Sequence, residues 1–218
     1  MPPKTAATKS ASNPPALTNY LRRYNLVSSI LWLSILVRVL KVGCEKGFDS
    51  GVVYDFNERY ARLIQTGAVL EVLHSLTGLV RAPVMTTLMQ VASRLLLVWG
   101  IGYNFPASTR NSPAYASMLV AWSVTEVIRY SYFVFVLAGK GVPGFLTWLR
   151  YNTFFVLYPL GVASETWLIY RAIPAAQKLN PAFAYALWGI LATYIPGFYT
   201  LFTHMLRQRS KVMKAKRV

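Results

Sequence analysis

The stretch that decides the fold is YASMLVAWSVTEVIRYSYFVFVLA, residues 115–138. A helix needs about 20 mostly apolar residues to cross the hydrocarbon core of a bilayer, and this stretch exceeds that length. It contains neither glycine nor proline, and its only charged residues are Glu126 and Arg129. The stretch is therefore predicted to be a membrane-spanning helix.

Working outward, five more apolar stretches predict further spans. The expected spans, in chain order and with residues 115–138 included, are 20–42, 61–80, 84–103, 115–138, 145–170 and 182–206. Breaks are expected at the polar loop 43–59 and at glycine- and proline-containing stretches, which punctuate helices: 81–83, 108–113, 139–144 and 174–181. The sequence thus predicts an all-α polytopic membrane bundle of six transmembrane helices over residues 20–206. A disordered cytosolic tail, 1–19, is expected before it, and a basic cytosolic tail, 207–218, after it.

The composition agrees with lipid as the main solvent. Hydrophobic residues make up 55% of the chain and charged residues 14%, against about 25% charged residues in a soluble domain. The net charge of +16 could indicate a nucleic-acid partner, but ten of the 23 basic residues lie in the first 23 or the last 12 positions, and the aromatic residues lie inside the apolar stretches. No nucleic-acid partner is therefore expected. An even number of spans with basic termini predicts that both termini are cytosolic.

The number and spacing of the cysteine and histidine residues exclude several kinds of site. The single cysteine, Cys44, allows no intrachain disulfide, and His74 and His204 lie far apart without other metal-ligand residues at suitable spacing. No metal site is expected. Ser50 stands six positions after Cys44, so the Cys-x5-Arg loop of a cysteine phosphatase is absent.

Three predicted spans contain charged groups that are expensive in a membrane interior. Glu71 and His74 share a helix face, as do Glu126 and Arg129. A polar stripe in the third span consists of Gln90, Ser93 and Arg94. Because buried polar groups need partners, these groups are interpreted first as contacts that join helices.

The fifth span differs from the others. Tyr151, Tyr158 and Glu165 follow one another at seven-residue intervals and therefore line one face of a helix. No basic residue lies three or four positions before Glu165, and Arg171 is six positions after it. A tyrosine and a carboxyl group without a local counter-charge suit general acid–base chemistry. The alternative is an aromatic packing stripe with one structural acid.

Several motifs occur in a fixed order from the second span onward. They are LIQT (63–66), LEVLH (70–74), GLVRAPV (78–84), QVASR (90–94), WGI (99–101), WS (122–123), TEVIRY (125–130), WLRY (148–151) and LYPLGVASE (157–165). With these motifs the chain resembles the very-long-chain 3-hydroxyacyl-CoA dehydratases of microsomal fatty-acid elongation, also called protein-tyrosine-phosphatase-like proteins. Ala82 and Leu160 stand where many members have Ser and Thr.

The resemblance implies dehydration of a (3R)-3-hydroxyacyl-CoA to the trans-2-enoyl-CoA, with no cofactor. The Tyr-Pro-x-Gly-x-x-x-Glu motif carries catalysis in that family, which makes Tyr158 and Glu165 the expected catalytic pair. Candidates for polarising the thioester carbonyl or holding the substrate are Tyr151, Asn152, Arg94 and Arg129. Expected partners are the bilayer and the other elongation enzymes: the condensing enzyme, the 3-ketoacyl-CoA reductase and the trans-2-enoyl-CoA reductase.

The sequence ends Lys214-Ala-Lys216-Arg-Val218, which matches the K-x-K-x-x pattern of cytosolic retrieval signals. Together with the resemblance, this pattern predicts residence in the endoplasmic reticulum membrane. The alternative for the pattern is a basic tail attracted to anionic lipid.

Two alternative functions are a small transporter, which would also bury Glu, Arg and Gln in its spans, and a non-catalytic scaffold for other membrane enzymes.

Overall fold

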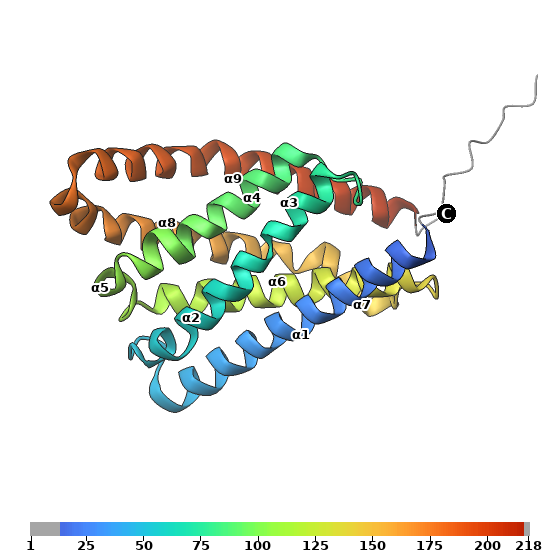
Figure 1. The fold of residues 1–218 in the computed structure, drawn as a ribbon, viewed down its shortest axis with the longest axis horizontal. Coiled ribbons are helices and arrows are strands. Elements are labelled where there is room, and N and C mark those ends of the chain that lie inside the picture. The colour runs from blue at the N-terminus through green and yellow to red at the C-terminus, as the bar shows by residue number, and fades with distance from the viewer. Residues whose placement is uncertain (1–13, 216–218) are drawn as a thin grey trace, which may run out of the picture.

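The computed structural model describes residues 14–215, and all of their regular structure is helical (Figure 1). The predicted all-α class is therefore confirmed. The elements are α1 (Pro15–Lys46), α2 (Val52–Gly67), α3 (Val69–Leu76), α4 (Val84–Leu95), the π-helical η1 (Leu96–Tyr103), α5 (Pro106–Thr109), α6 (Pro113–Ala138), α7 (Gly144–Asn152), α8 (Phe154–Leu179) and α9 (Pro181–Ala215).

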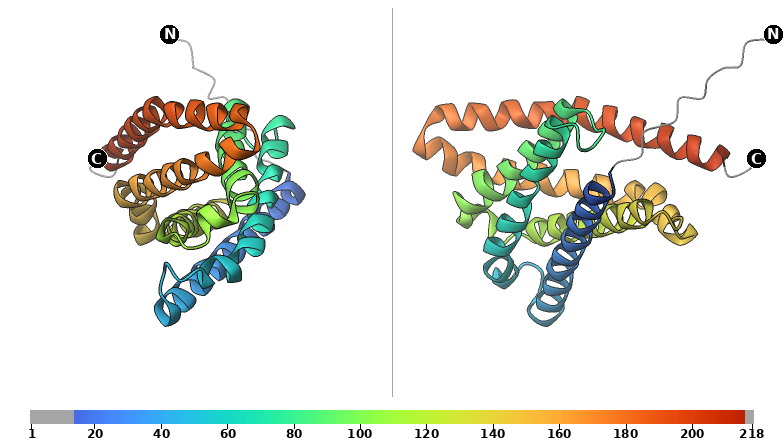
Figure 2. Two further views of the ribbon diagram at one scale, coloured as in Figure 1. Left: turned by 90° about the vertical axis from the view of Figure 1, so that its left-hand side faces the viewer. Right: turned by 45° about the vertical axis from the view of Figure 1, so that its right-hand side comes forward.

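Helix α6 lies at the centre of the bundle. It packs against α1 on one side and α8 on the other, and α9 packs on the far side of α8 (Figures 1 and 2). The core between α1, α6 and α8 consists of apolar side chains with at most 1% exposure, among them Ile35, Val39, Leu119, Leu168 and Ile169. Helix α2 lies against α1, and α3 pairs with α4.

Helix α9 is the least enclosed of the long helices. Its main partner is α8, and large side chains such as Tyr185, Ile195 and Tyr199 are more than 70% exposed. An exposed apolar face of this size is typical of a surface that meets lipid.

Four helical segments among the described residues are long and apolar enough to cross a membrane: Pro15–Lys46, Val84–Tyr103, Pro113–Ala138 and Pro181–Lys214. The other two predicted spans do not qualify. The second is interrupted at Ala68, between α2 and α3. The fifth is divided at Thr153, between α7 and α8. Helix α8 is long enough, but Pro159, Ser164 and Glu165 lower its apolar content.

The predicted loop 43–59 is largely helical, which corrects that prediction. Helix α1 continues to Lys46, and α2 begins at Val52 after Gly51, which adopts a left-handed conformation with φ of 75°. The buried residues of α2 recur every three or four positions: Val53, Tyr54, Asn57, Ala61 and Gln65. Two of the four acids in this stretch, Asp55 and Glu58, therefore lie on the polar side of an amphipathic helix, whereas Glu45 lies on α1 and Asp49 in the short connection.

The predicted break at 174–181 is limited to its end, at Asn180. Helix α8 runs through Pro174 to Leu179, and the chain leaves helical geometry at Asn180. Proline inside a helix costs about 3 kcal/mol, but Ala172, Ile173 and Ala176 around it are buried, and their packing offsets that cost.

At the two ends, the helices extend beyond the predicted spans. Helix α1 begins at Pro15, inside the predicted tail 1–19, and α9 continues to Ala215, inside the predicted tail 207–218. Residues 1–13 and 216–218 lie outside the described part of the chain, so most of the retrieval pattern does too.

The contact between α1 and α6 is expected to dominate stability. Leu119 of α6 is fully buried, so Leu119→Ala leaves a cavity and is expected to destabilise the protein by roughly 2–5 kcal/mol. Leu33→Ala, at a position 46% exposed, is the control and is expected to change little. Thermal unfolding in detergent measures both variants, and equal effects would contradict this description of the core.

Candidate active site

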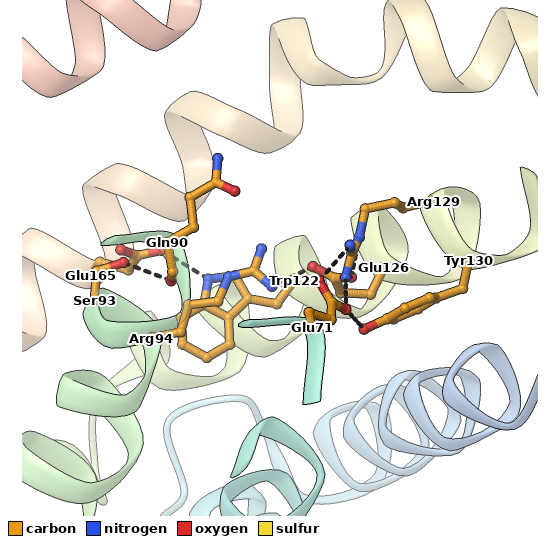
Figure 3. Close-up of polar contacts among 9 residues, drawn as sticks. All are labelled: Glu71, Gln90, Ser93, Arg94, Trp122, Glu126, Arg129, Tyr130 and Glu165. Atoms are coloured by element: carbon orange, nitrogen blue, oxygen red, sulfur yellow. Dashed lines mark hydrogen bonds and ion pairs between the residues drawn. The ribbon is translucent and has the colours of Figure 1, made fainter. Parts of the chain in front are cut away.

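The Glu165 carboxylate is held between two neighbouring helices. Its Oε1 accepts a hydrogen bond of 2.8 Å from Nε1 of Trp122 on α6 (Figure 3). Its Oε2 accepts one of 2.9 Å from the hydroxyl of Tyr194 on α9. Glu165 is thus fixed at the level where α6, α8 and α9 meet, inside the bundle.

Tyr158 lies seven residues earlier on α8, which is about 10 Å along a straight helix. Its ring stacks on Phe198 of α9, with centroids 5.2 Å apart and planes 15° apart, and lies 6.3 Å from the ring of Phe202. The side chain is half-buried. Among the hydrogen bonds of residues 14–215, none uses its hydroxyl, which is therefore available to a substrate.

Between these two residues, α8 approaches α6 closely. Gly161 is buried, and a Cβ at this position would lie 3.8 Å from Cβ of Ala121 and 3.9 Å from Oε1 of Glu165. Nearby, the hydroxyls of Ser164 and Ser117 lie 2.7 Å apart and link α8 to α6. Small residues on this face allow α6 to reach Glu165.

A network of four charged groups lies beside Glu165. Glu126, only 3% exposed, accepts hydrogen bonds from Arg94 of α4 and from Nε of Arg129 at 2.7 Å. Arg129 also binds the carboxylate of Glu71 on α3 through two bonds of 2.9 and 2.7 Å. The hydroxyl of Tyr130 donates to Glu71 as well (Figure 3). Two acids and two arginines neutralise one another across three helices, as the interpretation of helix-joining contacts predicted.

Glu71 and His74 share a face of α3 but have different partners. His74 is 5% exposed, and its Nε2 lies 2.9 Å from the hydroxyl of Tyr20 on α1. Tyr24 meets the same imidazole edge-on, with ring centroids 5.0 Å apart. His74 therefore joins α3 to α1.

Arg94 connects the network to Glu165. Its guanidinium carbon lies 5.1 Å from the centre of the Trp122 ring, and Trp122 donates to Glu165. The Arg94 side chain keeps 25% exposure. Gln90, one turn earlier on α4, is exposed, and Figure 3 shows it on the same stretch of helix as Ser93 and Arg94.

The structure separates the predicted substrate-binding residues into two groups. Arg94 lies next to Trp122 and Glu165, and Arg129 lies inside the charge network. Tyr151 and Asn152 lie at the end of α7, where Oδ1 of Asn152 accepts a 2.9 Å hydrogen bond from Nε of Arg209 on α9. The Tyr151 ring meets Tyr132 of α6, with centroids 6.5 Å apart.

Sequence reasoning assigned no role to the residues that hold the pair: Trp122, Tyr194, Phe198 and Phe202. Trp122 lies in a recognised motif, which was a usable signal. Tyr194 lies 29 positions after Glu165 on another helix, and only the packing of α9 on α8 reveals it. No group of three or more His, Cys, Asp or Glu side chains within the described residues is placed to hold a metal ion.

The comparisons with known proteins define the family. The family model described as "Protein tyrosine phosphatase-like protein, PTPLA" matches residues 65–215. The chain therefore belongs to the protein-tyrosine-phosphatase-like family.

Curated relatives match most of the chain. A Schizosaccharomyces pombe protein named "Probable very-long-chain (3R)-3-hydroxyacyl-CoA dehydratase" is 48% identical over 200 residues, which cover 89% of this chain and 93% of the relative. The Arabidopsis thaliana "Very-long-chain (3R)-3-hydroxyacyl-CoA dehydratase PASTICCINO 2" is 42% identical over 91% of this chain and 95% of its own length. Mouse "Very-long-chain (3R)-3-hydroxyacyl-CoA dehydratase 1" is 37% identical over 96% of this chain and 78% of its own length. No solved structure matches the chain.

The charge network is expected to be structural. Glu126→Gln removes the buried carboxylate between two partly exposed arginines and leaves both guanidinium groups with only Glu71 as counter-ion, which costs up to about 3–5 kcal/mol. Expression level and thermal unfolding in detergent measure the effect. The control is Asp55→Asn, because the exposed Asp55–Arg110 pair contributes about 1 kcal/mol or less. A Glu126→Gln protein as stable as this control would contradict the structural role.

Proposed function

We propose that this protein dehydrates very-long-chain (3R)-3-hydroxyacyl-CoA to trans-2-enoyl-CoA, the third step of the fatty-acid elongation cycle, with Tyr158 and Glu165 as the catalytic pair. The observation that carries the assignment is Glu165, an acid inside an apolar bundle whose carboxylate is fixed by Trp122 and Tyr194, two helical turns from an available tyrosine hydroxyl. Family membership and the printed names of the relatives support the reaction.

The chemistry divides between the two side chains. Glu165 takes the proton from C2 of the substrate, and the electrons of that C–H bond form the C2–C3 double bond. The C3 hydroxyl leaves as water with a proton from the Tyr158 hydroxyl. Both groups act as general acid–base catalysts, and neither forms a covalent intermediate.

Removal of the C2 proton places negative charge on the thioester oxygen. A fixed positive group near that oxygen stabilises the charge, and such stabilisation is worth most where water is excluded. Arg94 is the best-placed candidate because it combines partial exposure with a position on the Trp122 ring beside Glu165. Arg129 is engaged with Glu71 and Glu126, so its proposed contribution is to hold the network.

The CoA portion is proposed to bind at the end of the bundle where α7 lies. Tyr151 and Asn152 lie there, close to the basic residues Arg150 and Arg209. Guanidinium groups suit the phosphates of CoA. For C2 to meet Glu165 and C3 to meet Tyr158, the thioester lies beside Arg94 and the acyl chain turns back from it along the α8–α9 seam, past Phe198 and Phe202.

We propose that six helical segments cross the membrane. Helix α8 lies alongside α6 and α9, which both have the length and composition of a span (Figure 1). Helices α2 and α3 together form the remaining segment. Figure 1 places the start of α1 and the end of α9 at one end of the bundle. The acids outside the bundle interior, Glu45, Asp49, Asp55 and Glu58, lie in or around the α1–α2 connection at the opposite end.

This charge distribution supports cytosolic termini. The end that carries both termini also carries the α6–α7 loop with Lys140 and the basic end of α9, which fits the positive-inside rule. A cytosolic C-terminus would let the K-x-K-x-x pattern act as a retrieval signal, so the proposed location is the endoplasmic reticulum. The condensing enzyme, the 3-ketoacyl-CoA reductase and the trans-2-enoyl-CoA reductase are the proposed partners there.

Replacing either member of the pair should abolish most turnover. Tyr158→Phe removes one hydroxyl and Glu165→Gln removes the proton-accepting carboxylate, and each is expected to lower kcat at least about a hundredfold. The double variant should be little worse than the worse single variant, because groups that act in one step are non-additive. The assay is dehydration of a C20 or longer 3-hydroxyacyl-CoA by the purified protein in detergent.

Tyr170→Phe is the matched control, since Tyr170 lies on α8 with 51% exposure. It should retain wild-type turnover. A folded Glu165→Gln protein that dehydrates the substrate at the wild-type rate would contradict the mechanism and favour the scaffold alternative. Conduction of a solute by the protein in vesicles would favour the transporter alternative.

Topology is tested independently of activity. With six spans and cytosolic termini, a glycosylation acceptor appended to either end should stay unmodified in microsomes, while an acceptor inserted in the α1–α2 connection near Ser50 should be glycosylated. The inserted acceptor is the positive control for access to the lumen. Efficient glycosylation of the C-terminal tag would overturn both the orientation and the retrieval-signal interpretation.

A further inference from the structure

A groove opens between the start of α1 and the end of α6, at the end of the bundle where α1 begins and α9 ends (Figure 1). Its volume is about 590 Å³, and ligand sites typically measure about 300–1,000 Å³. The lining residues all come from α1, α6 and the α6–α7 loop, and they include Arg22, Leu26, Phe135, Ala138, Lys140 and Val142. The groove is therefore separate from the α8–α9 seam, which holds the proposed catalytic pair.

The polarity of the groove changes along the two helices. Arg22 lies near the start of α1, and Lys140 directly follows Gly139, the residue at which α6 ends. Leu26 lies one turn further into α1, and Phe135 lies about one turn inside the end of α6; their side chains are 48% and 39% exposed. The groove thus has two cations at the ends of its helices and apolar walls deeper in the bundle. This is the arrangement that a phospholipid presents, with a charged headgroup outside an apolar chain.

Arg22 and Lys140 form no ion pair with an acidic side chain within residues 14–215. The sequence contains seven acids. Four of them lie in or around the α1–α2 connection at the opposite end of the bundle. The other three bind groups in the bundle interior: Glu71, Glu126 and Glu165. The counter-charge for the two cations therefore has to come from outside the chain.

We propose that this groove binds an anionic phospholipid of the bilayer, with the phosphate between Arg22 and Lys140 and one acyl chain along Leu26 and Phe135. Guanidinium and ammonium groups both donate charge-assisted hydrogen bonds to phosphate oxygens. About one turn deeper, the hydroxyls of Ser29 and Ser131 lie 2.9 Å apart and hold α1 against α6, so the two walls of the groove are joined. The inference goes beyond the proposed function, because no part of the groove belongs to the catalytic machinery.

The site is tested by lipid binding to the purified full-length protein in detergent, measured by native mass spectrometry. The two lipids are dioleoylphosphatidylserine, which is anionic, and dioleoylphosphatidylcholine, which has no net charge. The wild type is expected to bind one phosphatidylserine at least about tenfold more tightly than phosphatidylcholine. Arg22→Gln and Lys140→Gln should each weaken phosphatidylserine binding about tenfold, because each removes one charge-assisted contact with the phosphate.

Two further variants separate the groove from the charge of the surface. Arg23→Gln is the matched control, because Arg23 is the next residue, is also exposed, and lines a different groove, between α1 and α2. It should leave the preference for phosphatidylserine intact. Ala138→Phe keeps both cations and fills the apolar part of the groove, so it should weaken phosphatidylserine binding without any change of charge. Thermal unfolding in detergent checks that each variant is folded, and Ala138→Phe carries the test if the charge variants do not fold.

Three outcomes would overturn the proposal. Equal affinity of the wild type for the two lipids would show that the cations do not select an anionic headgroup. Equal weakening by Arg23→Gln and Arg22→Gln would assign the attraction to the charged surface as a whole. Displacement of the bound lipid by an equal concentration of free CoA would assign the groove to the substrate. The dehydration assay of Tyr158→Phe and Glu165→Gln tests the proposed function separately from all three.

Discussion

The structure depends on the neutralisation of Glu126 inside the bundle. An uncompensated charge at membrane depth costs several kcal/mol, and Glu126 meets this constraint by binding Arg94 of α4 and Arg129 of its own helix. Arg129 in turn binds Glu71 of α3. A single buried acid on the central helix therefore fixes the positions of α3 and α4 relative to α6. Because Arg94 also lies over Trp122, the same network supports the indole that holds Glu165.

The parts of the fold that follow from local pattern could be predicted from the sequence. The bounds of the third span, Val84 and Tyr103, coincide with the limits of α4 and η1. Helix α6 is the fourth predicted span with two more residues at its start. In both, a long apolar stretch is bounded by proline, glycine or polar residues. The sequence could not indicate that α8 continues through Pro174, because the packing of Ala172 and Ala176 that compensates the proline involves other helices. The helical start of α2 was also missed, because the charged residues in 43–59 suggested a loop.

The candidate site, too, could be predicted from the sequence only in part. Helical periodicity was enough to place Tyr158 and Glu165 on one face, because seven residues are nearly two turns. Periodicity says nothing about the neighbours of that face. The groups that bind Glu165 are 43 positions earlier, at Trp122, and 29 positions later, at Tyr194. Only one of the two acids that bind Arg129 could be predicted. Glu126 lies three positions away in the sequence, whereas Glu71 lies 58 positions away. Proximity in sequence had paired Glu71 with His74 instead.

The position of the pair in the α8–α9 seam suits a very long acyl chain. Helix α9 packs chiefly on α8 and presents its remaining face outward, so one wall of the seam belongs to the least enclosed helix of the bundle. An acyl chain is as apolar as the lipid around α9, and a closed tunnel of fixed length is therefore unnecessary to keep it from water. The polar groups around Glu165 are held from the other side, by α6 and its charge network. This division, with a charged wall behind Glu165 and an apolar wall of Phe198 and Phe202 in front of Tyr158, would let the proposed acid–base pair act on the same two carbons whatever the length of chain beyond them.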